Sequence, residues 1–178
     1  MKRTNALVFL LCMFSLISCR QTSVPVREEF LIPAVSPYHM QDTVIYDSLN
    51  HLSFSRLRHA SDMGMYWHFE MPEEMQGKDY DLVFEGRVRS NYVQSKGVLV
   101  FTAYDMHKAQ VCWWTLPLSP HIEKLNEWNA FRDSLRLTGW INGAHYSTIR
   151  VFPFLGDSKQ EHLDFDTLKI TLKQRQEL

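Results

Sequence analysis

The chain has 178 residues and a formal net charge of −1 at pH 7, with 19 basic and 20 acidic residues. A chain of this length is the size of one ordinary domain, and its balanced charge lacks the basic excess that binding to a phosphate backbone demands. We therefore expect a single folded domain and no nucleic acid partner.

The first 18 residues have the pattern of a secretory signal. Basic residues 2–3 precede an apolar stretch over residues 6–17, and Ser18 stands directly before Cys19. The apolar stretch is about a dozen residues long, shorter than the ~18 residues that a transmembrane helix needs. The sequence therefore predicts a processed leader rather than a membrane-spanning helix.

The end of this leader, Leu16-Ile17-Ser18-Cys19, resembles the lipobox of bacterial lipoproteins. In that family the cysteine is acylated and becomes the first residue of the mature protein. The resemblance implies that residues 1–18 are removed, that Cys19 carries a lipid, and that the membrane is a partner through this anchor. An ordinary cleaved signal without a lipid is the alternative.

The residues after Cys19 bear on localisation. Lipoproteins held at the inner membrane commonly carry Asp directly after the cysteine, whereas this chain has Arg20. Surface-exported lipoproteins of some Gram-negative groups carry acidic residues just past the cysteine, and here the first is Glu28. The resemblance therefore implies an outer-membrane lipoprotein that faces the periplasm rather than the cell surface.

Residues 19–37 are predicted to form the lipidated cysteine and a flexible tether. Pro25, Pro33 and Pro37 interrupt any helix or central strand, and the polar residues around them favour a hydrated chain. We expect the folded domain to cover residues 38–178.

From about residue 42 onward, apolar and polar side chains alternate with the two-residue period of β-strands. Helical signal is confined to residues 72–76 and 120–128, and turn-forming residues separate the strand-like segments. This pattern predicts an all-β fold, a single antiparallel β-sandwich. The predicted strands cover residues 43–49, 63–71, 81–90, 97–105, 109–118, 130–137, 146–154 and 162–172.

Over about residues 50–173, the order of these features resembles the jelly-roll sandwiches of carbohydrate-binding modules and the wider galactose-binding-like group. The resemblance is carried by Asp79-Tyr80-Asp81-Leu82-Val83-Phe84-Glu85-Gly86-Arg87-Val88, Gly97-Val98-Leu99-Val100-Phe101, Glu127-Trp128-Asn129-Ala130-Phe131, Thr148-Ile149-Arg150-Val151-Phe152 and Leu163-Asp164-Phe165-Asp166-Thr167-Leu168-Lys169-Ile170. The acidic last strand of that family often lies near a structural calcium, which Asp164 or Asp166 would match. The alternative is a solvated pair of carboxylates, since calcium wants six to eight oxygens and no other ligands are identified. No other cofactor is expected.

The pair Trp113-Trp114 is the strongest candidate for a binding residue. Neighbouring residues on a strand point to opposite faces, so one indole is expected in the core and the other outside, and the sequence leaves open which is which. Alternation also directs Tyr104, Arg87 and Arg150 outward. A flat indole suits the apolar face of a sugar ring, and arginine donates to hydroxyl and carboxylate groups. The predicted ligand-binding residues are therefore Trp113, Trp114, Tyr104, Arg87 and Arg150.

These residues favour a protein that binds a glycan or a peptidoglycan-like polymer at the cell envelope. A structural or assembly lipoprotein that docks a protein partner is the alternative, and an outer aromatic residue covered by loops would carry no binding function. We expect no enzyme, because the sequence lacks a nucleophile elbow, a P-loop and a dinucleotide-binding glycine motif. Cys112, the remaining cysteine of the mature chain, is expected to be a small buried hydrophobe.

Overall fold

The computed structural model describes residues 23–31, 43–58, 65–157 and 160–175. The signal segment and Cys19 lie outside these ranges, and within them no helix is long and apolar enough to cross a membrane. The strands are β1 (Ser23–Leu31), β2 (Thr43–Asp47), β3 (Leu52–Leu57), β4 (Trp67–Glu70), β5 (Tyr80–Ser90), β6 (Gly97–Tyr104), β7 (Gln110–Pro117), β8 (Asn129–Leu137), β9 (Thr148–Leu155) and β10 (Leu163–Arg175). Two short 3-10 turns, η1 (Glu73–Met75) and η2 (Ser119–His121), lie between them.

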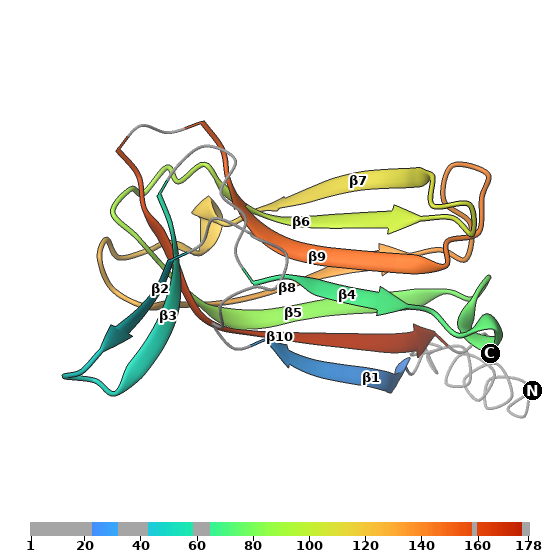
Figure 1. Ribbon diagram of the computed structural model, residues 1–178, viewed down its shortest axis with the longest axis horizontal. Helices are drawn as coiled ribbons and strands as arrows, with labels where there is room; N and C mark the ends of the chain where they lie inside the picture. The colour runs from blue at the N-terminus through green and yellow to red at the C-terminus, as the bar shows by residue number, and fades with distance from the viewer. Residues whose placement is uncertain (1–22, 32–42, 59–64, 158–159, 176–178) are drawn as a thin grey trace, which may run out of the picture.

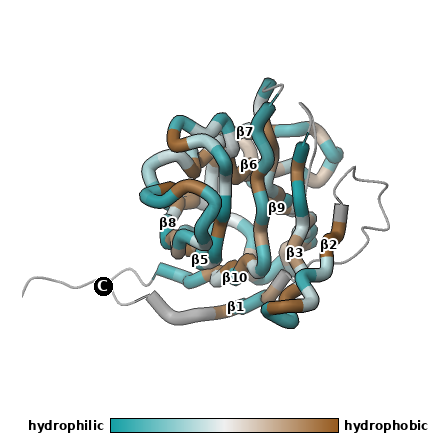
Figure 2. The backbone as a smooth tube through the Cα atoms, turned by 90° about the vertical axis from the view of Figure 1, so that its left-hand side faces the viewer, coloured by the Kyte–Doolittle hydropathy of each residue, from teal (hydrophilic) through white to brown (hydrophobic). Residues whose placement is uncertain are grey.

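The strands form two antiparallel sheets that stack face to face (Figure 1). Sheet A has the order β2-β3-β10-β5-β8, with β1 paired to the second half of β10, and sheet B has the order β4-β9-β6-β7. The end-on view shows β6, β7 and β9 in one layer and β5, β10 and β1 in the other (Figure 2). From β3 onward the chain passes between the sheets in the order of a jelly roll. The predicted all-β sandwich is confirmed.

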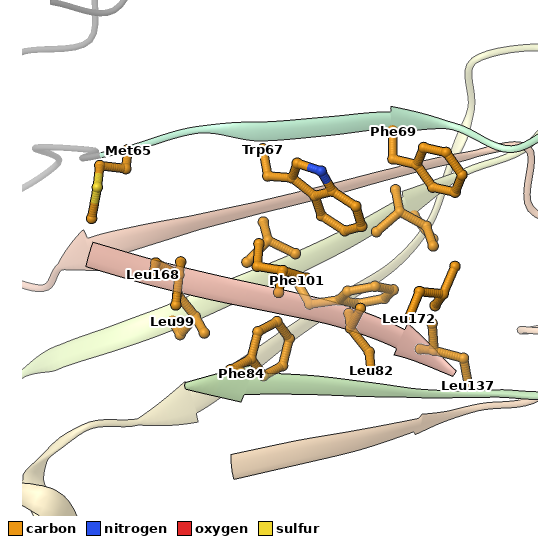
Figure 3. Close-up of a cluster of buried hydrophobic side chains, with 14 of the residues drawn as sticks. Met65, Trp67, Phe69, Leu82, Phe84, Leu99, Phe101, Leu137, Leu168 and Leu172 are labelled. Carbon is orange, nitrogen blue, oxygen red and sulfur yellow. The ribbon is translucent and has the colours of Figure 1, made fainter. Parts of the chain in front are cut away.

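The core lies between the two sheets and is built from alternate residues of their strands (Figure 3). Sheet B contributes Trp67 and Phe69 from β4 and Phe101 from β6, while sheet A contributes Phe84 from β5 and Leu168 from β10. Each of these side chains is at most 5% exposed. Burying large apolar side chains is the main favourable contribution to folding. Because every second residue of a strand enters this core, the residues between them must face outward.

Eight of the ten strands overlap the segments predicted from alternation, with shifts at the ends. The short strand β3 was not predicted, although its residues Phe54 and Leu57 are buried. Three of the six residues of β3 are polar, so its sequence shows no clear alternation of apolar and polar residues. Its pairing with β10 and β2 identifies it as a strand.

The prediction of a tether over residues 19–37 is wrong for residues 23–31, and with it the domain boundary at residue 38. This segment is strand β1, which pairs with β10 at the edge of sheet A (Figure 1). Pro25 lies at a register shift of this pairing, and proline is tolerated at edge strands and bulges. Glu28 pairs with Lys169 of β10 at 2.8 Å, and the Arg27 guanidinium lies 4.7 Å from the Phe69 ring centroid. The remainder of the predicted tether lies outside the described residues.

Asp164 of β10 joins three neighbouring strands on the outward face of sheet A. It lies between Arg56 of β3 and Arg89 of β5, and its carboxylate is fully buried. Arg56 donates to both carboxylate oxygens at 2.6 and 2.8 Å, and Arg89 Nε donates to one of them at 2.9 Å. Charge-assisted bonds of this kind are stronger than neutral ones.

These contacts bear on the calcium that the family resemblance suggests. Both oxygens of Asp164 already accept hydrogen bonds from guanidinium groups, and Asp166 forms an ion pair with Arg87. The described residues hold no group of three or more His, Cys, Asp or Glu side chains that could bind a metal ion. The two carboxylates are therefore buried partners of arginine, and the reading of them as a solvated pair is wrong.

We predict that Asp164→Asn lowers the free energy of unfolding by about 3 kcal/mol, because it leaves two guanidinium groups partly buried without their counter-charge. Chemical denaturation of the full-length protein in detergent measures the loss. Glu85→Gln is the matched control, since it breaks an ion pair with Arg132 whose side chains are 36% and 67% exposed, and it should cost less than about 1 kcal/mol. Equal losses in the two variants would contradict a structural role for Asp164.

Candidate functional site

The outward face of sheet B brings together residues from all four of its strands. Strand pairing places His68 of β4 beside Arg150 of β9, Arg150 beside Thr102 of β6, and Thr102 beside Trp113 of β7. Residues paired across neighbouring strands share a face of the sheet, so these four form a row that crosses it. With the aromatic residues around the row they make up the sheet-B patch, which comprises Tyr66, His68, Thr102, Tyr104, Trp113, Arg150 and Phe152.

Aromatic rings line one side of this row. The Trp113 ring meets Phe152 edge to face, with centroids 6.0 Å apart. Phe152 stacks on Tyr66 at 6.0 Å, and Tyr66 stacks on His68 at 6.3 Å. Phe152 is only 5% exposed, whereas Trp113 is 49% exposed. Trp113 therefore presents an open indole face that is held in place by a buried neighbour.

Tyr104 lies on the other side of the row, beside Arg150. The guanidinium carbon of Arg150 is 4.2 Å from the centroid of the Tyr104 ring, which is the geometry of a cation–π contact. Both residues are half-buried. Within the described part of the chain, Arg150 forms no ion pair and its buried Nε atom has no hydrogen-bond partner.

Thr102 lies at the centre of the row, between Arg150 and Trp113. Its side chain is fully buried, and its Oγ1 atom has no hydrogen-bond partner among the residues that the structure describes. A buried hydroxyl without a partner costs about 1–3 kcal/mol. Thr102 and Arg150 thus give the patch two polar groups whose hydrogen-bonding capacity is unused.

The structure answers which tryptophan of the predicted pair faces outward. Trp113 belongs to the sheet-B patch, whereas Trp114 pairs with Phe101 and stacks on its ring at 5.7 Å, on the core side of β7. Trp114 is 37% exposed because β7 is the edge strand of sheet B. Trp114 therefore covers the side of the core, and Trp113 is the outward member that the sequence left open.

Arg87 is also removed from the predicted site. It lies on β5 in sheet A, on the opposite layer of the sandwich, where it pairs with Asp166 and lies 5.8 Å from the Trp128 ring centroid. Sequence alternation correctly directs Arg87 outward but does not indicate which sheet it joins. Of the five predicted ligand-binding residues, the structure brings together Trp113, Tyr104 and Arg150.

Sequence reasoning did not assign Tyr66 and His68 to the site. His68 lies on β4, and Tyr66 directly precedes this strand. The large apolar residues Trp67 and Phe69, which are buried, dominate the sequence pattern of the segment. The alternation of that segment could have indicated two outward residues, but their proximity to Arg150 and Phe152 depends on the pairing of β4 with β9, 80 residues away in sequence.

Cys112 does not contribute a reactive group. It lies directly before Trp113 and points to the opposite side of β7, into the core, as predicted. Burial raises the pKa of its thiol to about 11, and a nucleophilic cysteine needs a lowered pKa. The sheet-B patch therefore offers aromatic rings, a guanidinium group, an imidazole and hydroxyl groups, and no thiol nucleophile.

No protein-family model matches the sequence, and no curated protein is similar to it. Among solved structures, the chain is similar to a carbohydrate-binding module (CBM6cm-2) from Cellvibrio mixtus lichenase 5A, solved with cellotriose, at 12% identity and a TM-score of 0.42 over 80% of this chain and 95% of the other. It is also similar to a CBM4 structure, at 12% identity and a TM-score of 0.43 over 85% and 89% of the two chains.

A component of the Gap123 glycosylation-associated complex from Streptococcus agalactiae is similar as well, at 13% identity and a TM-score of 0.46 over 82% of this chain and 44% of the other. All three comparisons give a TM-score below 0.5. The structures similar to this chain thus include carbohydrate-binding modules, but these similarities do not assign a ligand.

Proposed function

We propose that this protein is a lipid-anchored component of the cell envelope that binds a glycan through the sheet-B patch, and that its role is binding rather than catalysis. The observation that carries the proposal is the exposed and fixed indole of Trp113. The Trp113 side chain is 49% exposed, and its contact with the buried Phe152 holds it in place. Such a pre-ordered indole loses little entropy when a sugar ring stacks on it.

The groups around Trp113 supply the directed contacts that sugar recognition needs. Arg150 is two strands away, at about 10 Å given the spacing of neighbouring strands, so a saccharide lying across β6 can reach both side chains. Tyr104 and Thr102 add hydroxyl groups on the same face. A few polar groups beside an aromatic surface are typical of small-ligand sites.

The anchor determines where this face operates. Cys19 is separated from Ser23, the first residue of β1, by three residues, and an extended chain of this length spans at most about 15 Å. A lipid on Cys19 would therefore hold the sandwich close to the bilayer, without a long tether. We place the protein at the outer membrane, on its periplasmic face, on the strength of Arg20 and the late first acidic residue.

A protein partner is the second candidate function, and strand β7 favours it. This strand is the open edge of sheet B, it carries no charged residue, and it exposes both Trp113 and Trp114. Edge strands without charges can accept a further strand from another protein.

The first test is a screen of the full-length protein in detergent against neutral, acidic and peptidoglycan-derived glycans. We expect saturable binding that Trp113→Ala weakens about 30-fold or more, with a stability loss of about 1 kcal/mol. Trp140→Ala is the matched control, because Trp140 is 56% exposed and lies outside the patch. Trp114→Ala should retain binding and lower stability more, since it uncovers Phe101.

Two results would contradict the glycan proposal. Absence of binding across all three glycan classes would favour the docking function at β7 instead. Binding that is lost in Trp140→Ala and kept in Trp113→Ala would move the site away from the sheet-B patch.

The anchor is tested by Cys19→Ser. We expect the wild-type protein to sediment with membranes and the variant to be released, because a cysteine thiol is required for acylation. Mass spectrometry of the N-terminal peptide provides the direct readout. An unmodified N-terminus in the wild-type protein would refute the lipid anchor and leave the glycan site unaffected.

A further inference from the structure

Among the residues that the structure describes, Arg150 has no carboxylate partner. Seven other arginines in the described ranges form ion pairs with Asp or Glu side chains, namely Arg27, Arg56, Arg87, Arg89, Arg132, Arg136 and Arg175. Arg150 forms no ion pair with any carboxylate of the described residues, and its guanidinium makes a cation–π contact with the Tyr104 ring. Within the described part of the chain, Arg150 therefore gives the sheet-B patch a positive charge that no ion pair balances.

The carboxylate of Glu70 on the same face forms no ion pair with Arg150. Glu70 lies on β4, opposite Thr148 of β9, one row away from Arg150. Its Oε1 atom is 3.5 Å from His68 Nε2, and its side chain is 83% exposed. The remaining patch residues on β6, β7 and β9 are uncharged. A half-buried guanidinium without a carboxylate partner is unfavourable, so the free patch has unused affinity for an anion.

The contact with Tyr104 leaves the donors of Arg150 available. A guanidinium carries five N–H donors, and a cation–π contact engages its positive charge with the face of the ring. The Tyr104 contact therefore holds the group in place and leaves N–H groups that can donate to a ligand. A carboxylate matches this planar edge with two parallel hydrogen bonds, which a neutral hydroxyl group cannot do.

Thr102 provides an independent observation at the same place. It is paired directly with Arg150, it is fully buried, and its hydroxyl has no partner among the described residues. Its other neighbour, Trp113, lies on the edge strand and is half exposed. A ligand oxygen that enters between Arg150 and Trp113 would meet this hydroxyl and give it the hydrogen bond that it lacks.

We infer that the glycan bound by the sheet-B patch is acidic and that it carries its charge as a sugar carboxylate. This inference rests on the proposed glycan-binding function. The indole of Trp113 contacts the apolar face of the sugar ring, Arg150 donates two hydrogen bonds to the carboxylate, and the Thr102 hydroxyl bonds the same end of the sugar. Neutral glycans bind the same face more weakly, because they leave Arg150 without a counter-charge.

The test compares ligands that differ only in the carboxylate. Oligomers of galacturonate, glucuronate and mannuronate are titrated into the full-length protein in detergent, each beside the same oligomer with its carboxyl groups reduced to alcohols. We expect at least one acidic oligomer to bind roughly 10- to 100-fold more tightly than its reduced form. Its affinity should fall as salt is raised, because salt screens the charge attraction.

Single substitutions test whether the preference for the acidic oligomer arises from the sheet-B patch. Arg150→Gln should weaken binding of the acidic oligomer much more than binding of the reduced one, and so remove the preference for the acidic form. Arg132→Gln is the matched control, since it removes the same charge from a residue of sheet A that is 67% exposed, and it should preserve the preference. Thr102→Val should weaken binding while the Tm is unchanged or higher, because the lost hydroxyl makes no hydrogen bond in the free protein.

The outcomes separate the two proposals. Equal affinity for the acidic and reduced oligomers, or a preference that survives in Arg150→Gln, would overturn the inference and leave glycan binding intact. Absence of binding to every member of the acidic and reduced pairs and to the wider glycan screen would overturn the proposed function itself. A lower Tm with unchanged affinity in Thr102→Val would make that hydroxyl structural and remove it from the site.

Discussion

The two-residue period of the β-strand is the constraint on which the candidate site depends. Each outward residue of the sheet-B patch is the direct neighbour of a residue buried between the sheets, as Thr102 is of Phe101 and Trp113 is of Cys112. The large apolar side chains of the core set which face of each strand is inward, and the register of β4, β9, β6 and β7 then aligns the outward residues in rows. Hydrophobic burial thus brings the polar and aromatic groups of the patch to one face, where they form their ring and cation–π contacts.

The two outer faces of the sandwich use arginine in different ways. On sheet A, Arg56 and Arg89 enclose the buried Asp164, so their charges are balanced and they join three strands. On sheet B, Arg150 is stacked on Tyr104 and has no such partner in the described part of the chain. Removing Asp164 would leave Arg56 and Arg89 without their counter-charge, whereas Arg150 forms no ion pair with any described residue even in the wild-type protein. We therefore interpret sheet A as the structural face and sheet B as the binding face.

Sequence patterning accounts for most of the strands and for part of the site. Alternation predicted the outward direction of Tyr104, Arg87 and Arg150, because direction is a local property of a strand. It could not predict that Arg87 and Arg150 lie on different sheets, since sheet membership depends on pairings between distant segments. The pairing of Arg89 with Asp164 spans 75 residues and is equally hidden in the sequence. Strand β1 was missed because its proline indicated a tether, whereas an edge strand with a register shift accommodates it.

The central claim is that the outward face of sheet B binds the ligand, and the indole N–H signals of the protein test it most directly. The chain has five tryptophans, and each gives one such signal in a two-dimensional nitrogen–proton NMR spectrum that single Trp→Phe variants can assign. During titration with an acidic oligosaccharide that binds, the account predicts that the Trp113 signal moves with ligand concentration while those of Trp128 and Trp140 stay in place. Movement of the Trp128 or Trp140 signal with Trp113 unchanged would contradict it and place the binding site on sheet A or on the loops.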